Sequence, residues 1–544
     1  MVAPAINKIK LFLSLKVVTT LIVILAIGSR IIQLISLFNI RADRVQQMLA
    51  TQNFVSGHGI STAWVFPGKL SQVIYEPLIK WPPGYSLLLA PFYLIFNKDY
   101  LLAGLALDIV AAVMLIFVSR AILKILDIPI FLVNLYTFLT TFFIYSFYSK
   151  PSSDAIAITF FVGAFYFTLL LLKSGTHWVK KTGGIIFLLF MCASIKYLFI
   201  PVVFVIPLFL VWKGIADKRL EVKKAGIYSL LILAFSLAAL LAYQKLISGS
   251  ATYIASPERG LFLPHLLAAF PFIPASFIKL DTIGLIFTPW IEHLVFRFFQ
   301  CLHLLLLFFC LFWVFQVLVK KKIKQLSLAD SFFFLAFFTS LTITIVLIIL
   351  SVSVAREVTE QGGFWTYVEE PRYYGLPCVL IHLGVFVFYQ NYQRSSSRYF
   401  KIIFFALIIF LLPEFFRGVY FESRRIMNFK KEKYSWQMEL EVQKFADEII
   451  KKALQKQPAE NIIVAGSSTY INNRVSLYSH IPILKDVYKI NDLATLNTKK
   501  KVLILIILRE DALPDFQRFI SMKEKEIAGH INIFSFYTVY VSPH

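Results

Sequence analysis

Long apolar segments recur along most of the chain and are separated by short polar connections. Most of them approach the roughly 20 apolar residues that a helix needs to cross a bilayer. They lie at about 11–38, 100–119, 128–147, 154–172, 183–198, 199–213, 225–247, 298–319, 329–354, 375–390 and 400–416. This pattern predicts an all-α polytopic membrane protein with about 11 transmembrane helices.

The region between the first two apolar segments, residues 39–99, has a different pattern. In its first half Val45, Met48 and Leu49 fall on one helical stripe, which is typical of an amphipathic helix at a membrane surface. Its second half contains the sequence PPGY at positions 82–85, followed by an apolar run of about 13 residues, too short for a span. We therefore expect an outer loop with interfacial helices.

The composition changes after the last apolar segment. Residues 424–544 begin with a basic amphipathic stretch and continue with strand-like segments, such as 502–508, that alternate with helical ones. This alternation predicts a small α/β domain with its own core. The expected division is a transmembrane catalytic domain over 1–423 and an outward-facing α/β domain over 424–544.

Composition and charge support the membrane class. The chain has 544 residues, of which 58% are hydrophobic, and a formal net charge of +23. The basic residues form short clusters between apolar segments, as the positive-inside rule requires, so no nucleic-acid partner is implied. If residues 82–96 are interfacial, these clusters share the cytoplasmic side with the N-terminus. The loop 39–99 and the C-terminal domain then face outward.

Metal ligation is not indicated by the sequence. The four cysteines lie in or beside apolar segments, without a CxxC motif. His58 stands between two glycines with no second ligand at metal-binding spacing, so a turn is the favoured interpretation. No cofactor is predicted, although a divalent metal stays open.

Two acids are candidates for acid–base chemistry on the outer side. Asp43 begins the first outer loop, and Asp154 begins the span near 154–172. Each has a structural alternative. Asp43 and Gln46 have the spacing of a capping box, and Asp154 could cap the helix that follows Pro151.

Several cations and one aromatic residue are candidates for holding an anion at headgroup level. They are Lys80, Lys150, Lys196, Arg372 and Tyr373. An arginine can bind a phosphate through two parallel hydrogen bonds, whereas a lysine acts as a point charge. The alternatives are interfacial lysines and a salt bridge between Arg372 and a neighbouring glutamate. Arg30, inside the first span, is expected by default to snorkel toward the interface.

Five short motifs resemble one known family. They are Asp43, the GHG sequence at 57–59, PPGY at 82–85, SSD at 152–154 and EPRY at 370–373. Their order resembles the GT-C superfamily of integral-membrane glycosyltransferases. The nearest branch contains protein O-mannosyltransferases, aminoarabinose transferases of lipid A and lipopolysaccharide-core transferases. The resemblance covers residues 10–420.

The resemblance implies an inverting glycosyltransferase of a bacterial cytoplasmic membrane. The donor would be a polyprenyl-phosphate-linked sugar, and the acceptor would be a hydroxyl of a glycan, lipid or protein on the outer face. Asp43 would act as the base and Asp154 as an auxiliary acid. The donor phosphate would be bound by Lys80, Lys150, Lys196, Arg372 and Tyr373.

The sequence departs from the family pattern at three positions. Many relatives have two adjacent acids where Asp43 is flanked by Ala42 and Arg44, and many have an aromatic residue where Gln47 stands. Lys196 occupies a position that is often arginine. Two other functions stay open: a flippase or transporter of lipid-linked sugars, and a polysaccharide ligase or polymerase.

Overall fold

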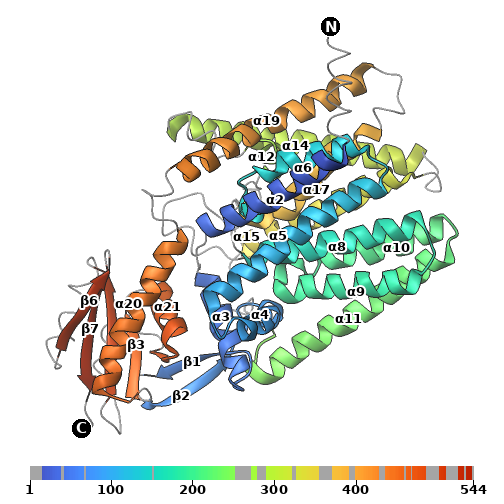
Figure 1. Ribbon diagram of the computed structural model, residues 1–544. Coiled ribbons are helices and arrows are strands. Elements are labelled where there is room, and N and C mark those ends of the chain that lie inside the picture. Colours follow the sequence, from blue (N-terminus) through green and yellow to red (C-terminus); the bar gives the residue numbers. More distant parts are fainter. Residues whose placement is uncertain are drawn as a thin grey trace. The chain divides into compact units, whose positions relative to one another are not determined.

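The structure is a computed structural model of the chain (Figure 1). It describes residues 15–37, 42–66, 69–149, 152–251, 271–278, 289–320, 326–353, 371–390, 398–427, 435–458, 461–466, 469–484, 502–509, 525–531 and 534–541.

Within these residues, nine helices are long and apolar enough to cross a membrane. They include α2 (Lys16–Ser36), α5 (Tyr100–Ile125), α8 (Ser153–Lys173), α9 (Trp178–Ile195), η1 to α10 (Tyr197–Ala216), α11 (Leu220–Ser248), α14 (Pro289–Lys320), α15 (Leu328–Ser353) and α19 (Arg398–Met427). The predicted class, a mostly helical multi-pass membrane protein, is confirmed.

Three apolar helices are shorter. They are α4 (Gly84–Ile95), α6 (Ile130–Thr141) and α17 (Gly375–Val387). We expected full spans at 128–147 and 375–390, but α6 has 12 residues and α17 has 13. Helix α6 ends at Thr141 and helix α17 ends at Val387, before the apolar runs that contain them end. Helix α4 starts after Pro83, as the PPGY sequence predicts.

The chain forms two compact units, which we describe separately. Unit 1 comprises residues 1–35, 108–242 and 254–432. Unit 2 comprises residues 36–107, 243–253 and 433–544. Unit 1 therefore contains most of the long helices, whereas unit 2 joins the first outer loop to the C-terminal segment.

Close helix packing in unit 1 depends on glycine where α10 (Val205–Ala216) meets α11. A Cβ added at Gly226 would lie 2.5 Å from the backbone nitrogen of Val211, and one added at Gly214 would lie 2.3 Å from that of Lys223. Small residues let helix backbones approach closely, which drives helix association where lipid surrounds the protein. Glycine is therefore required at this crossing.

A buried polar network also joins helices of unit 1. The Arg30 guanidinium of α2 donates to the backbone oxygens of Thr140 and Phe143 at the end of α6. Glu422 of α19 accepts hydrogen bonds from Ser29 Oγ at 2.8 Å and from Gln33 Nε2 at 2.9 Å. One turn of α2 therefore binds both α6 and α19.

Unit 2 is built on a seven-stranded sheet with the order β2-β1-β4-β3-β5-β7-β6. The strands are β1 (Ser61–Phe66), β2 (Lys69–Pro77), β3 (Ile462–Gly466), β4 (Ile483–Leu484), β5 (Val502–Arg509), β6 (Lys525–Ile531) and β7 (Phe534–Val541). Strands β1, β4, β3 and β5 are parallel, and the remaining pairs are antiparallel. Residues 502–507 of β5 are all buried, as a central parallel strand requires.

The sheet differs from the expected C-terminal domain in one respect. Residues 61–77 of the outer loop, which we treated as a polar connector, form the hairpin β1–β2 at one edge. In β1, Trp64 and Val65 align with Ile483 and Leu484 of β4. Helix α21 (Thr469–Ser479) also packs on α3 (Ala42–Val55), which carries Asp43. The C-terminal segment thus completes a structure that the outer loop begins.

We predict that Gly226→Ala lowers the thermal stability of the purified protein in detergent. The added methyl group meets the backbone of α10, and such overpacking typically costs about 1–3 kcal/mol. Gly183→Ala in α9 is the matched control, because a Cβ there meets nothing within 4 Å. The control should unfold at the wild-type temperature or slightly above it. Equal unfolding temperatures for the two variants would contradict the prediction.

Candidate functional site

Asp154 lies in the first turn of α8 but does not cap it. Ser152 occupies the N-cap position, and its side chain accepts a hydrogen bond from the Ala155 backbone nitrogen at 3.2 Å. The alternative that Asp154 caps the helix is therefore wrong, because Ser152 is the N-cap residue. The Asp154 carboxylate is left to make a different contact.

That contact is a buried ion pair with Lys196. The Lys196 ammonium binds Asp154 Oδ1, and the two side chains are only 11% and 5% exposed. Lys196 stands at the break between α9 and η1 (Tyr197–Phe199), where its backbone is extended at φ −149° and ψ 125°. This break lets the Lys196 side chain at the end of α9 reach Asp154 at the start of α8.

Tyr373 completes this cluster. It lies in η6 (Pro371–Tyr374), and the Lys196 ammonium nitrogen is 4.8 Å from the centroid of its ring. An aromatic face stabilises a nearby cation by about 0.5–2 kcal/mol. The structure therefore brings together three of the residues selected from the sequence, Asp154, Lys196 and Tyr373, within unit 1.

Stability alone gives little reason for this ion pair. Withdrawing two charges from water has a cost that their attraction only partly offsets, so a buried ion pair is a poor source of folding energy. The Lys196 ammonium is held away from water and oriented by the Asp154 carboxylate.

Two predicted phosphate ligands lie at the edge of what the structure describes. Lys150 is outside the described residues. The backbone of Arg372 belongs to η6, but its side chain is not among those described. Both stay predictions.

In unit 2, Asp43 lies in the first turn of α3 and is half-buried. A carboxylate there is favoured by the partial positive charge of the helix N-terminus. Lys80 is exposed, and its ammonium lies 4.8 Å from the Trp81 ring centroid. His58 stacks on Tyr75 of β2 with ring centroids 3.9 Å apart.

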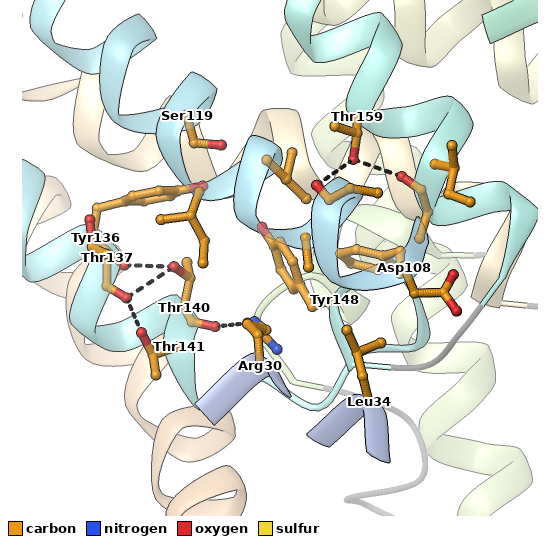
Figure 2. Close-up of a pocket in the computed structure, with 17 residues that line it drawn as sticks. Arg30, Leu34, Asp108, Ser119, Tyr136, Thr137, Thr140, Thr141, Tyr148 and Thr159 are labelled. Atoms are coloured by element: carbon orange, nitrogen blue, oxygen red, sulfur yellow. Dashed lines mark hydrogen bonds between the residues drawn. The ribbon is translucent and has the colours of Figure 1, made fainter. Parts of the chain in front are cut away.

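A cavity lined by both polar and apolar side chains lies among α2, α5, α6 and α8 of unit 1 (Figure 2). Figure 2 shows Arg30 beside the Tyr148 ring, whose centroid is 4.9 Å from the guanidinium carbon. Arg30 is 4% exposed and binds backbone oxygens, so the expectation that it snorkels is wrong. Its partners lie within the protein at the end of α6.

The sequence analysis missed three residues around this cavity. Tyr148 donates its hydroxyl to His382 Nδ1 at 3.2 Å, since His382 Nε2 must carry the proton that it donates to the Ser276 carbonyl at 2.7 Å. Asp108 of α5 also lines the cavity and is 4% exposed. An acid inside an apolar span was a detectable signal for Asp108. His382, inside the apolar run at 375–390, carried the same signal, whereas Tyr148 had no comparable pattern.

Across the residues that the structure describes, no group of three or more histidine, cysteine, aspartate or glutamate side chains could hold a metal ion.

Comparisons with known proteins give one structural similarity. No protein-family model matches the chain, and no curated protein sequence does. Two crystal structures of ArnT from Cupriavidus metallidurans match, one in the apo state and one bound to undecaprenyl phosphate. The fold is similar to that of ArnT. Each match covers 95% of this chain and 97% of the ArnT chain at 12% identity, with TM-scores of 0.46 and 0.44.

At this low identity the matches show a similarity of fold only.

We predict that Asp154→Asn destabilises the protein by roughly 3–5 kcal/mol, because it leaves the Lys196 ammonium buried without its counter-charge. Asp127→Asn is the matched control. It breaks the exposed Lys173–Asp127 pair, whose side chains are 42% and 73% exposed, and should cost less than about 1 kcal/mol.

Thermal or denaturant unfolding of the purified variants measures both effects. The double variant Asp154→Leu with Lys196→Met should recover much of the loss, since it removes both charges together. Equal stability of Asp154→Asn and Asp127→Asn would show that the buried pair is not formed.

Proposed function

We propose that this protein is an inverting glycosyltransferase that moves a sugar from a polyprenyl-phosphate donor to an acceptor hydroxyl. The observation that carries the proposal is the buried contact of Lys196 with Asp154 and Tyr373. These residues come from separate parts of the chain, and Asp154 and Tyr373 belong to motifs that resemble GT-C enzymes. A desolvated cation in such a cluster fits a lipid-linked phosphate.

The reaction is a single displacement at the anomeric carbon. The acceptor oxygen forms a bond to that carbon while the bond from carbon to the phosphate oxygen breaks. The acceptor proton passes to the Asp43 carboxylate, and the polyprenyl phosphate leaves. A positioned base of this kind accelerates a reaction by roughly 10²–10⁴-fold.

Charge development explains the need for cations. The donor is a phosphodiester with one negative charge, and the leaving polyprenyl phosphate gathers a second. Interactions that strengthen as this charge grows lower the barrier rather than merely binding the donor. Lys196 and Lys80 would serve this role together with Lys150, Arg372 and Tyr373. Asp154 would orient the Lys196 ammonium.

The shared sheet of unit 2 supports the proposed topology. Strands β1 and β4 pair directly, so the loop 39–99 and the C-terminal segment must lie on the same side of the membrane. An even number of crossings must then separate them. Eight of the nine long described helices lie between Tyr100 and Met427, and α6 with α17 would make ten. The positive-inside pattern supports an arrangement in which this shared side faces outward and the N-terminus lies in the cytoplasm.

We predict that Asp43→Asn reduces sugar transfer by at least about 10²-fold, because asparagine cannot accept the acceptor proton. Membranes containing the variant are assayed with radiolabelled polyprenyl-phosphate sugars and membrane acceptors. Asp99→Asn is the matched control, since Asp99 is a half-buried acid of the same unit whose carboxylate binds the Leu102 backbone nitrogen at 2.9 Å. Asparagine keeps that hydrogen bond, so the control should transfer normally. Normal transfer by Asp43→Asn would exclude the proposed mechanism.

A further inference from the structure

Arg44, the residue after Asp43, points into the protein. It is 3% exposed, and its guanidinium makes two directed hydrogen bonds within unit 2. Nε donates to the Tyr85 hydroxyl at 2.7 Å, and Nη2 donates to the Gly104 backbone oxygen at 3.0 Å. One side chain therefore joins α3 to two other helices, α4 and α5.

The Tyr85 end of this contact is rigid. Tyr85 is fully buried in the first turn of α4, immediately after the Pro82-Pro83-Gly84 sequence. Proline restricts the backbone that leads into the helix. The Arg44 guanidinium also lies 5.8 Å from the centroid of the Tyr85 ring. The tyrosine hydroxyl is thus a fixed acceptor for the arginine.

Glycine at the Gly104 end leaves room for two side chains of α3. A Cβ at this position would lie 2.6 Å from Met48 Cε and 2.9 Å from Arg44 Nη2. Glycine in the early part of α5 lets α3 come close enough for the guanidinium to reach the carbonyl. The contact geometry therefore depends on α3, α4 and α5 together.

A second set of hydrogen bonds continues along the same face of α3. The Ser86 hydroxyl donates to the Gln47 backbone oxygen at 2.8 Å, and the Thr51 hydroxyl is 3.2 Å from the Ser86 backbone oxygen. These bonds hold the middle of α3 against α4. Arg44 makes its two hydrogen bonds from the first turn of α3, where Asp43 lies.

We propose that Arg44 is a positioning residue that fixes the first turn of α3 and thereby aims the Asp43 carboxylate. The proposal rests on the function proposed above for Asp43. It also accounts for the departure from the family pattern of two adjacent acids, because the position beside Asp43 serves as a helix anchor. Lysine cannot replace it, since a single ammonium lacks the planar fork that reaches Tyr85 and Gly104 at once.

Two variants test the contact from its two ends. Tyr85→Phe keeps the ring and removes the acceptor, and Arg44→Lys keeps the charge and removes the fork. Each should lower kcat by roughly 10–100-fold, with KM for the polyprenyl-phosphate sugar within about twofold of wild type, because a misplaced base slows the chemistry without weakening donor binding. Their combination should cost little more than either alone, since both break one interaction.

Tyr93→Phe is the matched control. Tyr93 is a buried tyrosine of the same helix, 1% exposed, and it stacks on Tyr100 with ring centroids 5.1 Å apart. Removal of its hydroxyl should leave kcat near the wild-type value. An equal loss in this control would assign the effect of Tyr85→Phe to general disturbance of α4, and would overturn the proposal.

Hydrogen–deuterium exchange of the full-length protein in detergent gives a readout that needs no activity. The α3 amides in residues 42–55 should exchange about tenfold faster in Tyr85→Phe than in wild type or Tyr93→Phe. Faster exchange in Tyr85→Phe would support Arg44 as the residue that fixes α3, even if Asp43→Asn retained sugar transfer. Retained transfer by Asp43→Asn would reject only the proposed function. Unchanged exchange in α3 together with unchanged kcat in both test variants would overturn the role of Arg44.

Discussion

Charges placed among apolar helices must find their partners within the protein, because lipid offers no hydrogen bonds. Two contacts in unit 1 follow this constraint. Arg30 binds the carbonyl oxygens at the end of α6, and Glu422 binds two side chains of α2. Apolar surfaces alone would let many helix pairings compete. These polar contacts select among them, since each one leaves a costly unpaired group if the wrong helices meet.

The same constraint shapes the candidate site. Asp154 supplies the counter-charge that makes the burial of the Lys196 ammonium tolerable. Under the proposed function, this ammonium is already out of water when a phosphate binds, so its interaction with the leaving group needs no further desolvation, which is the advantage of a preorganised site.

Most of the long helices were predictable, because a membrane-spanning helix is recognisable in the sequence by its length and hydropathy. The short helices α6 and α17 were overestimated, since apolar runs at 128–147 and 375–390 continue past their helix ends. The hairpin β1–β2 was missed because its partner β4 lies some 400 positions later along the chain, and β4 is only two residues long.

Residues of the candidate site could be selected from the sequence, but the contacts between them could not be predicted. Asp154, Lys196 and Tyr373 were selected from separate parts of the chain, but nothing in their spacing indicated that the lysine would bind the aspartate. Arg44 was noted only as a departure from a pattern. Its bonds to Tyr85 and Gly104 depend on three helices meeting, and neither periodicity nor composition carries that information.

The sheet order has a consequence for biosynthesis. Strand β1 is synthesised long before β4. The β1 edge of the β1–β2 hairpin therefore stays unpaired until nearly the whole polypeptide has been made. Pairings between such distant segments form slowly, and an exposed strand edge invites wrong partners in the meantime. The outer unit can therefore mature only after translation is almost complete, and a nascent chain stalled before its last hundred residues would hold an unfinished sheet.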